Sequence, residues 1–256
     1  MTIKYEKKGE RIALITLNRP EALNALDGAL RKDFADALRK ASGDKEIWAI
    51  VVTGEGRGFC AGGDIRDFAA EGTAEDKLNV EYSASLTVIR TCEKPVIAAV
   101  NGPAAGIGMT LALSCDLSVM SEEAYMMCAF SNIGMVPDGG LSLLMTQYLG
   151  YVRAFQLAIE AEKIDAARAL EWGLVNRVVP ATDVVTNAIS WAETIVERAP
   201  IAIALTKRAF RNASQERVMN ISAFEAYLQS VASRTEDCRE GAFAKLQKRK
   251  PIFKGQ

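Results

Sequence analysis

The sequence predicts an α/β fold, in which short buried strands alternate with helices. Two apolar runs, 12–17 and 48–53, end at turn-forming residues and are typical of buried strands. Between them, the segment 29–41 carries apolar side chains at spacings of three and four, which predicts an amphipathic helix. The irregular spacing of these elements favours a wound, spiral arrangement over a regular barrel.

The other strands of the first half are predicted from similar patterns. Polar and apolar residues alternate over 1–10, which indicates a first strand. A buried strand is expected at 96–100, followed by a turn at 101–103 and by a helix of small residues through 109–113. The run 116–120 predicts a further buried strand.

From Leu141 onward the pattern is helical, apart from one strand-like run at 174–179. Pro200 lies where a helix would begin, and Pro251 lies just after a predicted helix. We therefore place a domain boundary at 199–200. The segments with helical apolar spacing near the end of the chain are 190–196, 201–213, 218–231 and 241–248.

The composition is typical of a soluble globular protein. The chain has 256 residues, 49% of them hydrophobic, and a net charge of −1. A nearly neutral chain lacks the basic surface that nucleic acid binding requires. The sequence has no run of 18 or more apolar residues, and its N-terminus lacks the apolar stretch of a secretory signal. We expect no nucleic acid partner, no membrane partner and a cytoplasmic location.

The cysteine and histidine content limits the possible chemistry. The five cysteines are scattered and have no CxxC spacing, so we expect reduced thiols, no disulfide and no metal site. Histidine is absent from the sequence, which excludes Ser-His-Asp, Cys-His and histidine-ligated metal chemistry. Any proton transfer must therefore use a carboxylate, Lys, Tyr, Cys or water.

Two glycine-rich segments, 58–65 and 101–109, follow predicted strands. Glycine lets a backbone approach a ligand closely, so each segment can present an N–H group directly. Two such donors would stabilise the enolate oxygen of a thioester, and a helix that begins near Gly108 would add its dipole. The alternative is purely structural, with the first segment as a turn and the second as a close helix crossing.

Seven short segments carry further motifs: 18–26 (NRPEALNAL), 59–65 (FCAGGDI), 94–102 (KPVIAAVNG), 105–108 (AGIG), 134–140 (GMVPDGG), 240–241 (EG) and 248–253 (KRKPIF). Together, in this order and spacing, they resemble the crotonase (enoyl-CoA hydratase/isomerase) family over nearly the whole chain. The resemblance implies a crotonase-like spiral of ββα repeats in 1–199 and a helical oligomerisation region in 200–256. It also implies homotrimers or dimers of trimers. The substrate would be an acyl-CoA, in which coenzyme A is part of the substrate, with no other cofactor.

By this resemblance, the backbone N–H groups of Gly63 and Gly108 form an oxyanion hole for the thioester oxygen. Ala61 is expected at the adenine end of coenzyme A, with Leu23 and Ala25 along the pantetheine path. The basic run 245–254 either reaches the CoA phosphates or is a solvated tail. The residues expected to bind the acyl-CoA are Leu23, Ala25, Ala61, Gly62, Asp64 and Ile65, and Asp64 is expected to order its loop rather than transfer protons.

Both glutamates that hydratases of this family use are absent. The positions that match them are Thr110 and Phe130. Asp138 lies where enoyl-CoA isomerases of the family carry an acidic proton shuttle, and apolar neighbours would raise its pKa. The alternative is that Asp138 caps the helix that follows, and both roles are compatible.

The sequence therefore predicts an acyl-CoA isomerase, in which Asp138 moves a proton while Gly63 and Gly108 hold the enolate. One alternative is a hydratase that uses another carboxylate or a bound water. Another is a non-catalytic acyl-CoA-binding protein. Acyl chain and pathway stay open.

Overall fold

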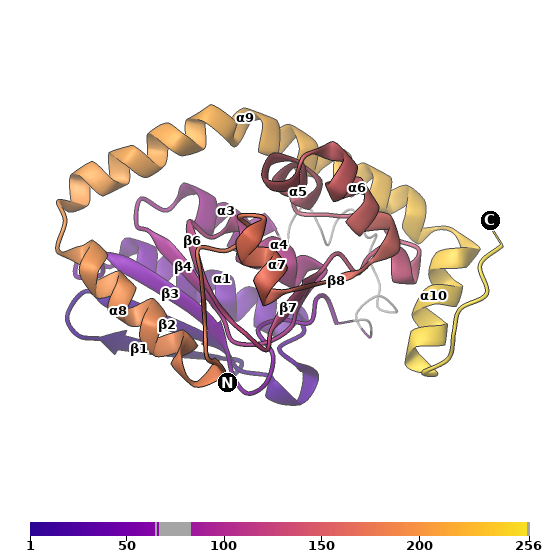
Figure 1. Ribbon diagram of the computed structural model, residues 1–256, viewed down its shortest axis with the longest axis horizontal. Helices are drawn as coiled ribbons and strands as arrows, with labels where there is room; N and C mark the ends of the chain where they lie inside the picture. The colour runs from indigo at the N-terminus through magenta and orange to yellow at the C-terminus, as the bar shows by residue number, and fades with distance from the viewer. Residues whose placement is uncertain (65, 67–82, 255–256) are drawn as a thin grey trace.

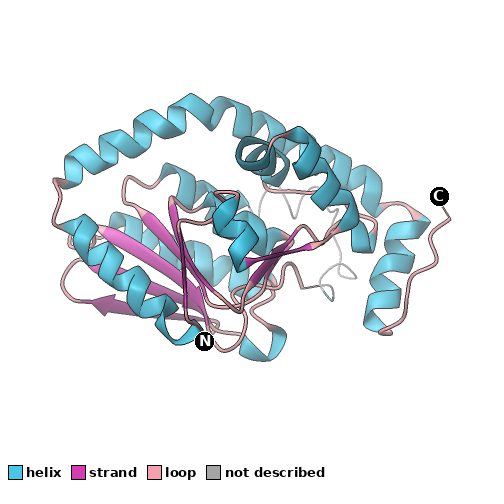
Figure 2. Ribbon diagram, in the orientation of Figure 1, coloured by secondary structure: helices cyan, strands magenta, loops and turns pink. Residues whose placement is uncertain are grey.

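The computed structural model describes residues 1–64, 66 and 83–254. Among these residues, the main sheet has six strands in the order β1-β2-β3-β4-β6-β9. Figure 2 draws the strands in magenta and the helices around them in cyan. The first two strands pair antiparallel, and all later neighbours pair parallel. The strands are β1 (Ile3–Lys8), β2 (Ile12–Leu17), β3 (Ala49–Gly54), β4 (Val96–Val100), β6 (Leu117–Ser121) and β9 (Arg177–Val179).

Helices cover both faces of this sheet, as its almost fully apolar strands require. On one face, alternate residues of the central strands, such as Val51 and Ile97, pack against α8 (Val184–Val196). On the other face, their neighbours pack against α1 (Gly28–Gly43), α3 (Ser83–Thr91) and α4 (Ile107–Ser114). The predicted α/β fold is confirmed, and Figure 1 shows the sheet between these layers.

A second, smaller sheet lies beside the main one and was not predicted. It consists of β5 (Ala104–Ala105), β7 (Tyr125–Met127) and β8 (Lys163–Asp165) in that order. Strands of two or three residues are too short to show a periodic pattern, so they cannot be predicted from the sequence. The strand-like run at 174–179 is likewise shorter than predicted, since only Arg177–Val179 pairs with β6.

The C-terminal part is helical, as predicted. Its last long helix, α9 (Pro200–Ser233), arches over the core in Figure 1 and leads to α10 (Glu236–Leu246). The prediction of two helices, 201–213 and 218–231, was wrong. The intervening residues 214–217 interrupt the apolar spacing but include no proline or glycine, so the helix continues through them.

The remaining helices connect these layers. Among the described residues, three are α-helices, α5 (Leu141–Leu149), α6 (Tyr151–Glu160) and α7 (Ala166–Glu171), and three are single 3₁₀ turns, η1 (Pro20–Ala22), η4 (Ser131–Ile133) and η5 (Ala181–Asp183). In the part of the chain that the structure describes, no helix is both long enough and apolar enough to cross a membrane. All five cysteines are buried, with free thiols.

Asp116 links α9 to the ends of the interior strands β4 and β6, since it lies just before β6 and binds the first residue of β4. Its carboxylate accepts a hydrogen bond from the Val96 N–H at 2.8 Å and forms ion pairs with Lys207 (2.6 Å) and Arg211 (2.8 Å) of α9. Asp116 therefore has the structural role that its place beside an apolar strand suggests.

Candidate functional site

The two glycine-rich segments lie side by side. The Ala105 N–H donates to the Cys60 carbonyl at 3.0 Å, and the Cys60 N–H donates to the Pro103 carbonyl at 3.1 Å. These two bonds form a parallel bridge between Cys60 and Ala104. The structure thus brings together two segments that are more than forty residues apart in the sequence.

Gly63 presents a free N–H because of its place in another bridge. It pairs with Leu26, and the bonds of that bridge run from the Leu26 N–H to the Gly62 carbonyl (2.8 Å) and from the Asp64 N–H to the Leu26 carbonyl (3.1 Å). Since both bonds use the neighbours of Gly63, its own N–H points to the other side. None of the hydrogen bonds between described residues uses this N–H.

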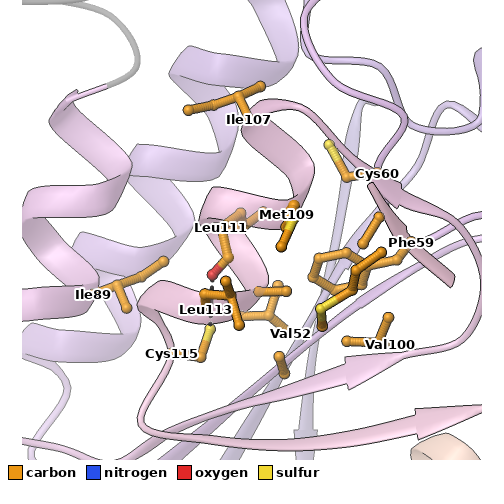
Figure 3. Close-up of a cluster of buried hydrophobic side chains, with 14 of the residues drawn as sticks. Val52, Phe59, Cys60, Ile89, Val100, Ile107, Met109, Leu111, Leu113 and Cys115 are labelled. Atoms are coloured by element: carbon orange, nitrogen blue, oxygen red, sulfur yellow. Dashed lines mark hydrogen bonds between the residues drawn. The ribbon is translucent and has the colours of Figure 1, made fainter. Parts of the chain in front are cut away.

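Gly108 is the second residue of α4, which begins at Ile107 as the predicted helix near Gly108 requires. Its N–H is among the first of the helix, which have no acceptor four residues earlier, and no described residue accepts a bond from it. A Cβ at this position would lie 2.1 Å from the Cys60 carbonyl oxygen, so only glycine allows the two segments to meet. Figure 3 shows α4 packed into the core through Met109 and Leu111.

The predicted acyl-CoA-binding residues gather around the same place. The segment that contains Leu23 and Ala25 runs beside Ala61, whose N–H donates to the Leu23 carbonyl at 3.0 Å. Gly62 has φ +113°, a conformation that favours glycine, and its carbonyl accepts from Leu26. Ile65 lies outside the described residues.

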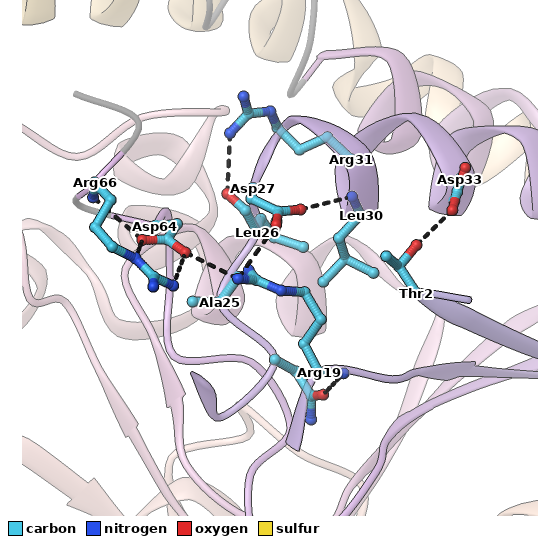
Figure 4. A network of polar contacts seen from close by, with 11 residues as sticks. Thr2, Arg19, Ala25, Leu26, Asp27, Leu30, Arg31, Asp33, Asp64 and Arg66 are labelled. Atoms are coloured by element: carbon cyan, nitrogen blue, oxygen red, sulfur yellow. Dashed lines mark hydrogen bonds and ion pairs between the residues drawn. The ribbon is translucent and has the colours of Figure 1, made fainter. Parts of the chain in front are cut away.

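Asp64 is held in a network of charged side chains (Figure 4). Its carboxylate accepts from the Arg66 guanidinium at 2.9 and 2.7 Å and from Arg19 at 3.1 Å. Arg19 also donates to the Ala25 carbonyl at 2.5 Å and pairs with Asp27 at 3.2 Å. Arg66 and Arg19 hold the pKa of Asp64 well below its usual range, which suits a residue that orders its loop.

Asp138 lies beside the first turn of α4. The Thr110 hydroxyl donates to the Asp138 carbonyl at 3.3 Å. The adjacent Gly139 fits closely against α4, since a Cβ there would lie 3.0 Å from side-chain atoms of Ile107 and Thr110. The chain segment that carries Asp138 therefore abuts the helix that carries Gly108.

The Asp138 side chain is buried and poorly satisfied. Its Oδ1 atom has no hydrogen-bond partner among the described residues, and its Oδ2 atom has one long contact of 3.5 Å, from the Gln229 amide. Burial and the nearby Glu225 carboxylate raise the pKa of Asp138 to about 8. An acid with this pKa can take up and release a proton near neutral pH.

The alternative role of Asp138 as a helix cap is wrong. Helix α5 begins at Leu141, its N-cap is Gly140, and the Asp138 side chain makes no capping bond. The Glu225 carboxylate, from α9, instead accepts bonds from the N–H groups at the start of α5. It accepts from the Gly140 N–H at 2.5 Å, from the Ser142 N–H at 2.9 Å and from the Ser142 hydroxyl. No local pattern predicts this contact, because Glu225 and Gly140 are 85 positions apart in the sequence.

The two positions that match the hydratase glutamates lie in apolar surroundings. Thr110 and Phe130 are both buried, and the Phe130 ring lies next to Gly106, where a Cβ would be 3.8 Å from its Cζ atom. Neither residue can accept a proton from water. Within residues 1–64, 66 and 83–254, no cluster of three or more His, Cys, Asp or Glu side chains could hold a metal ion.

Comparison with known proteins agrees with this architecture. The sequence model of the enoyl-CoA hydratase/isomerase family matches residues 7–256. A probable enoyl-CoA hydratase from Rhodobacter capsulatus is 41% identical, over 100% of this chain and 98% of the relative. A 1,2-epoxyphenylacetyl-CoA isomerase from Escherichia coli is 35% identical, over 99% of this chain and 98% of the relative.

A solved structure shows the same fold. The crystal structure of an enoyl-CoA hydratase from Mycobacterium avium subsp. paratuberculosis has a TM-score of 0.90, with 34% identity and 99% of both chains covered. Sequence and structure thus agree that this protein is an enzyme. The chain belongs to the enoyl-CoA hydratase/isomerase family, within the crotonase superfamily. Its relatives include both hydratases and isomerases.

Proposed function

We propose that this protein is an enoyl-CoA isomerase with Asp138 as its proton shuttle. The observation that carries the proposal is a buried Asp138 with few hydrogen bonds, together with two N–H groups, on Gly63 and Gly108, in adjoining segments; no described residue accepts a bond from either N–H. The thioester oxygen accepts from these two donors. Coenzyme A lies along the segment that contains Leu23, Ala25, Ala61 and Gly62.

The reaction conserves protons and electrons. Asp138 removes a proton from the carbon next to the thioester carbonyl of a 3-enoyl-CoA, and the negative charge moves to the oxygen that Gly63 and Gly108 hold. Asp138 then returns the proton two carbons further along the acyl chain, and the double bond moves into conjugation with the thioester. These two proton transfers need no water, metal ion or redox partner.

Isomerisation is favoured over hydration because a hydratase must activate water. The hydratase glutamates are replaced by Thr110 and Phe130. Glu225 is a second buried carboxylate near Asp138, but its oxygens already accept bonds from Gly140 and Ser142. Asp138 is therefore the only described carboxylate next to α4 whose oxygens are free to accept a substrate proton.

Turnover assays on 3-enoyl-CoA and 2-enoyl-CoA panels test the proposal. The wild-type protein should isomerise 3-enoyl-CoA at least about tenfold faster than it hydrates 2-enoyl-CoA. Asp138→Asn cannot accept a proton, so its isomerase kcat should fall by roughly 10² to 10⁴ while acyl-CoA affinity stays within a few-fold. Efficient hydration, or full isomerase turnover by the variant, would contradict the proposal. Acyl-CoA binding without turnover on any substrate would favour a binding protein.

A further inference from the structure

The C-terminal helix α9 contributes two buried polar side chains to the segment that carries Asp138. Glu225 and Gln229 are four residues apart and therefore lie on the same face of α9. Both are buried, and both bind the segment 136–142. A buried polar side chain needs a partner, and these two find theirs almost entirely in this segment.

Gln229 binds the backbone on the N-terminal side of Asp138. Its side-chain amide donates to the Val136 carbonyl at 2.9 Å and accepts from the Val136 N–H at 3.0 Å, so it satisfies both polar groups of that residue. The same nitrogen lies 3.5 Å from Asp138 Oδ2. Gln229 thus fixes the approach to Asp138 and provides the one donor that its carboxyl group has among the described residues.

Glu225 binds the backbone on the C-terminal side. It accepts from the N–H groups of Gly140 and Ser142, so the chain is held both before and after Asp138. The first N–H groups of α5 stabilise negative charge on Glu225. Burial raises the pKa of Glu225 as well, but among the described residues Asp138 has no comparable set of donors, so negative charge is better stabilised on Glu225 than on Asp138.

The ionisable groups around Asp138 come from several elements. Glu225 faces it from α9, and Cys128 lies close to it from the segment after β7. Arg90, from α3, donates to the Gly139 carbonyl at 2.5 Å and is electrostatically coupled to Glu225. Burial raises the pKa of the Cys128 thiol to about 12, so the thiol stays neutral. Among the described residues, Glu225 is therefore the charged group that most opposes ionisation of Asp138.

We propose that Glu225 and Gln229 are positioning residues through which α9 sets the orientation and the charge state of Asp138. Glu225 disfavours the ionised form of Asp138 by like charge, whereas Gln229 favours it by hydrogen bonding. The proton affinity of the base in the spiral core is then set by the C-terminal helix. The role in catalysis rests on the proposed function, but the control of Asp138 can be measured without substrate.

The test is a pH titration of the Asp138 carboxyl carbon by ¹³C NMR, with the signal assigned by its loss in Asp138→Asn. Glu225→Gln removes a negative charge and should lower the titration midpoint by about one pH unit or more. Gln229→Met removes the donor but keeps a similar side-chain length, so it should raise the midpoint. The control is Glu93→Gln, which removes a charge from an exposed ion pair with Arg208 and should leave the midpoint unchanged.

Opposite shifts in the two variants would support the proposal, because general loosening of the fold cannot produce both directions. Midpoints equal to that of Glu93→Gln, or shifts in the same direction, would overturn it. The acid limb of kcat/KM should move with each midpoint. If the midpoints shift as expected but Asp138→Asn keeps full turnover, the control by α9 stands and the proposed function fails.

Discussion

At the scale of the residue, the proposed site centres on one carboxyl group in an environment that opposes its charge. Asp138 is buried and has only one long hydrogen bond in the part of the chain that the structure describes. Asp64, not far away in the predicted site, has the opposite environment, with two arginines on its oxygens. The two acids therefore suit different roles, since of the two only Asp138 has a pKa near neutral pH, at about 8.

The pH dependence of turnover follows from the raised pKa of Asp138. A base works only in its ionised form, so isomerase kcat/KM should rise with pH and level off above about 8, where burial and Glu225 set the pKa of Asp138. The measurement is a pH profile of kcat/KM for a 3-enoyl-CoA, because this ratio reports the pKa values of the free enzyme. A profile that is flat from pH 6 to 9 would show that Asp138 does not control the rate.

Stability should depend on pH with an unusual sign. Because the folded pKa of Asp138 is about 8 and an unfolded Asp titrates near pH 4, the native state binds more protons between these values. The free energy of unfolding therefore falls as pH rises through this window. Asp138→Asn does not have to ionise a buried carboxyl group at high pH. At pH 9 its free energy of unfolding should therefore exceed that of the wild type by up to roughly 5 kcal/mol, and the difference should be smallest at pH 4.

Urea unfolding at several pH values measures this difference. Asp36→Asn is the control, because Asp36 lies on the exposed surface of α1, where it pairs with Arg39. That change should alter the unfolding free energy by no more than about 0.5 kcal/mol at any of these pH values. An Asp138→Asn variant that is less stable than the wild type at pH 9 would contradict the prediction.

How far the sequence predicted the site depends on the distance between partners along the chain. Gly63, Gly108 and Asp138 belong to local motifs, and the structure brings their segments together, although their roles remain predictions. Glu225 and Gln229 belong to no motif. Their contacts join residues 85 and 93 positions apart, and only the folded chain reveals such pairs.

At the scale of the element, long apolar segments were predicted well and short ones were not. β2 and β4 have the predicted bounds, and α1 extends the predicted helix by one residue at its start and two at its end. The small sheet was missed because its strands derive their stability from tertiary pairing rather than from a local pattern. α9 was divided in two for the converse reason, since a local polar interruption does not end a helix that packing supports.

The junction of the two glycine segments yields a prediction at this scale. Gly108→Ala would place a methyl group 2.1 Å from the Cys60 carbonyl oxygen, so the segments must separate. We expect a loss of about 1 to 3 kcal/mol in the free energy of unfolding and a larger loss in kcat, because the Gly108 N–H moves away from the substrate oxygen. Thermal melting and turnover measure the two effects.

Gly43→Ala is the matched control for this substitution. Gly43 is the last residue of α1, and a Cβ there would meet nothing within 4 Å. Stability should therefore stay the same or increase by up to about 1 kcal/mol, and turnover should not change. If both alanine variants behaved alike, the close approach of Gly108 to Cys60 would have no role in the site.

At the scale of the whole molecule, many large apolar side chains are exposed, as at surfaces that other proteins cover. Helix α6 exposes Tyr151, Val152, Phe155 and Ile159, with the Tyr151 and Phe155 rings stacked at 5.7 Å. Helix α9 also exposes large apolar side chains, among them Ile201 and Tyr227. The predicted trimer or dimer of trimers would cover such a surface, whereas a monomer leaves it in water.

The last prediction tests this assembly. We expect the protein to have three or six times the mass of one chain in analytical ultracentrifugation. If α6 lies at the interface, the double change Val152→Lys and Phe155→Lys places two charges in an apolar contact and should shift the protein to smaller species. Glu10→Lys is the control, because it changes the net charge by the same amount on an exposed turn residue far from α6 in sequence. A wild-type protein that sediments as a monomer would contradict the assembly, and an unchanged mass in the double variant would move the interface away from α6.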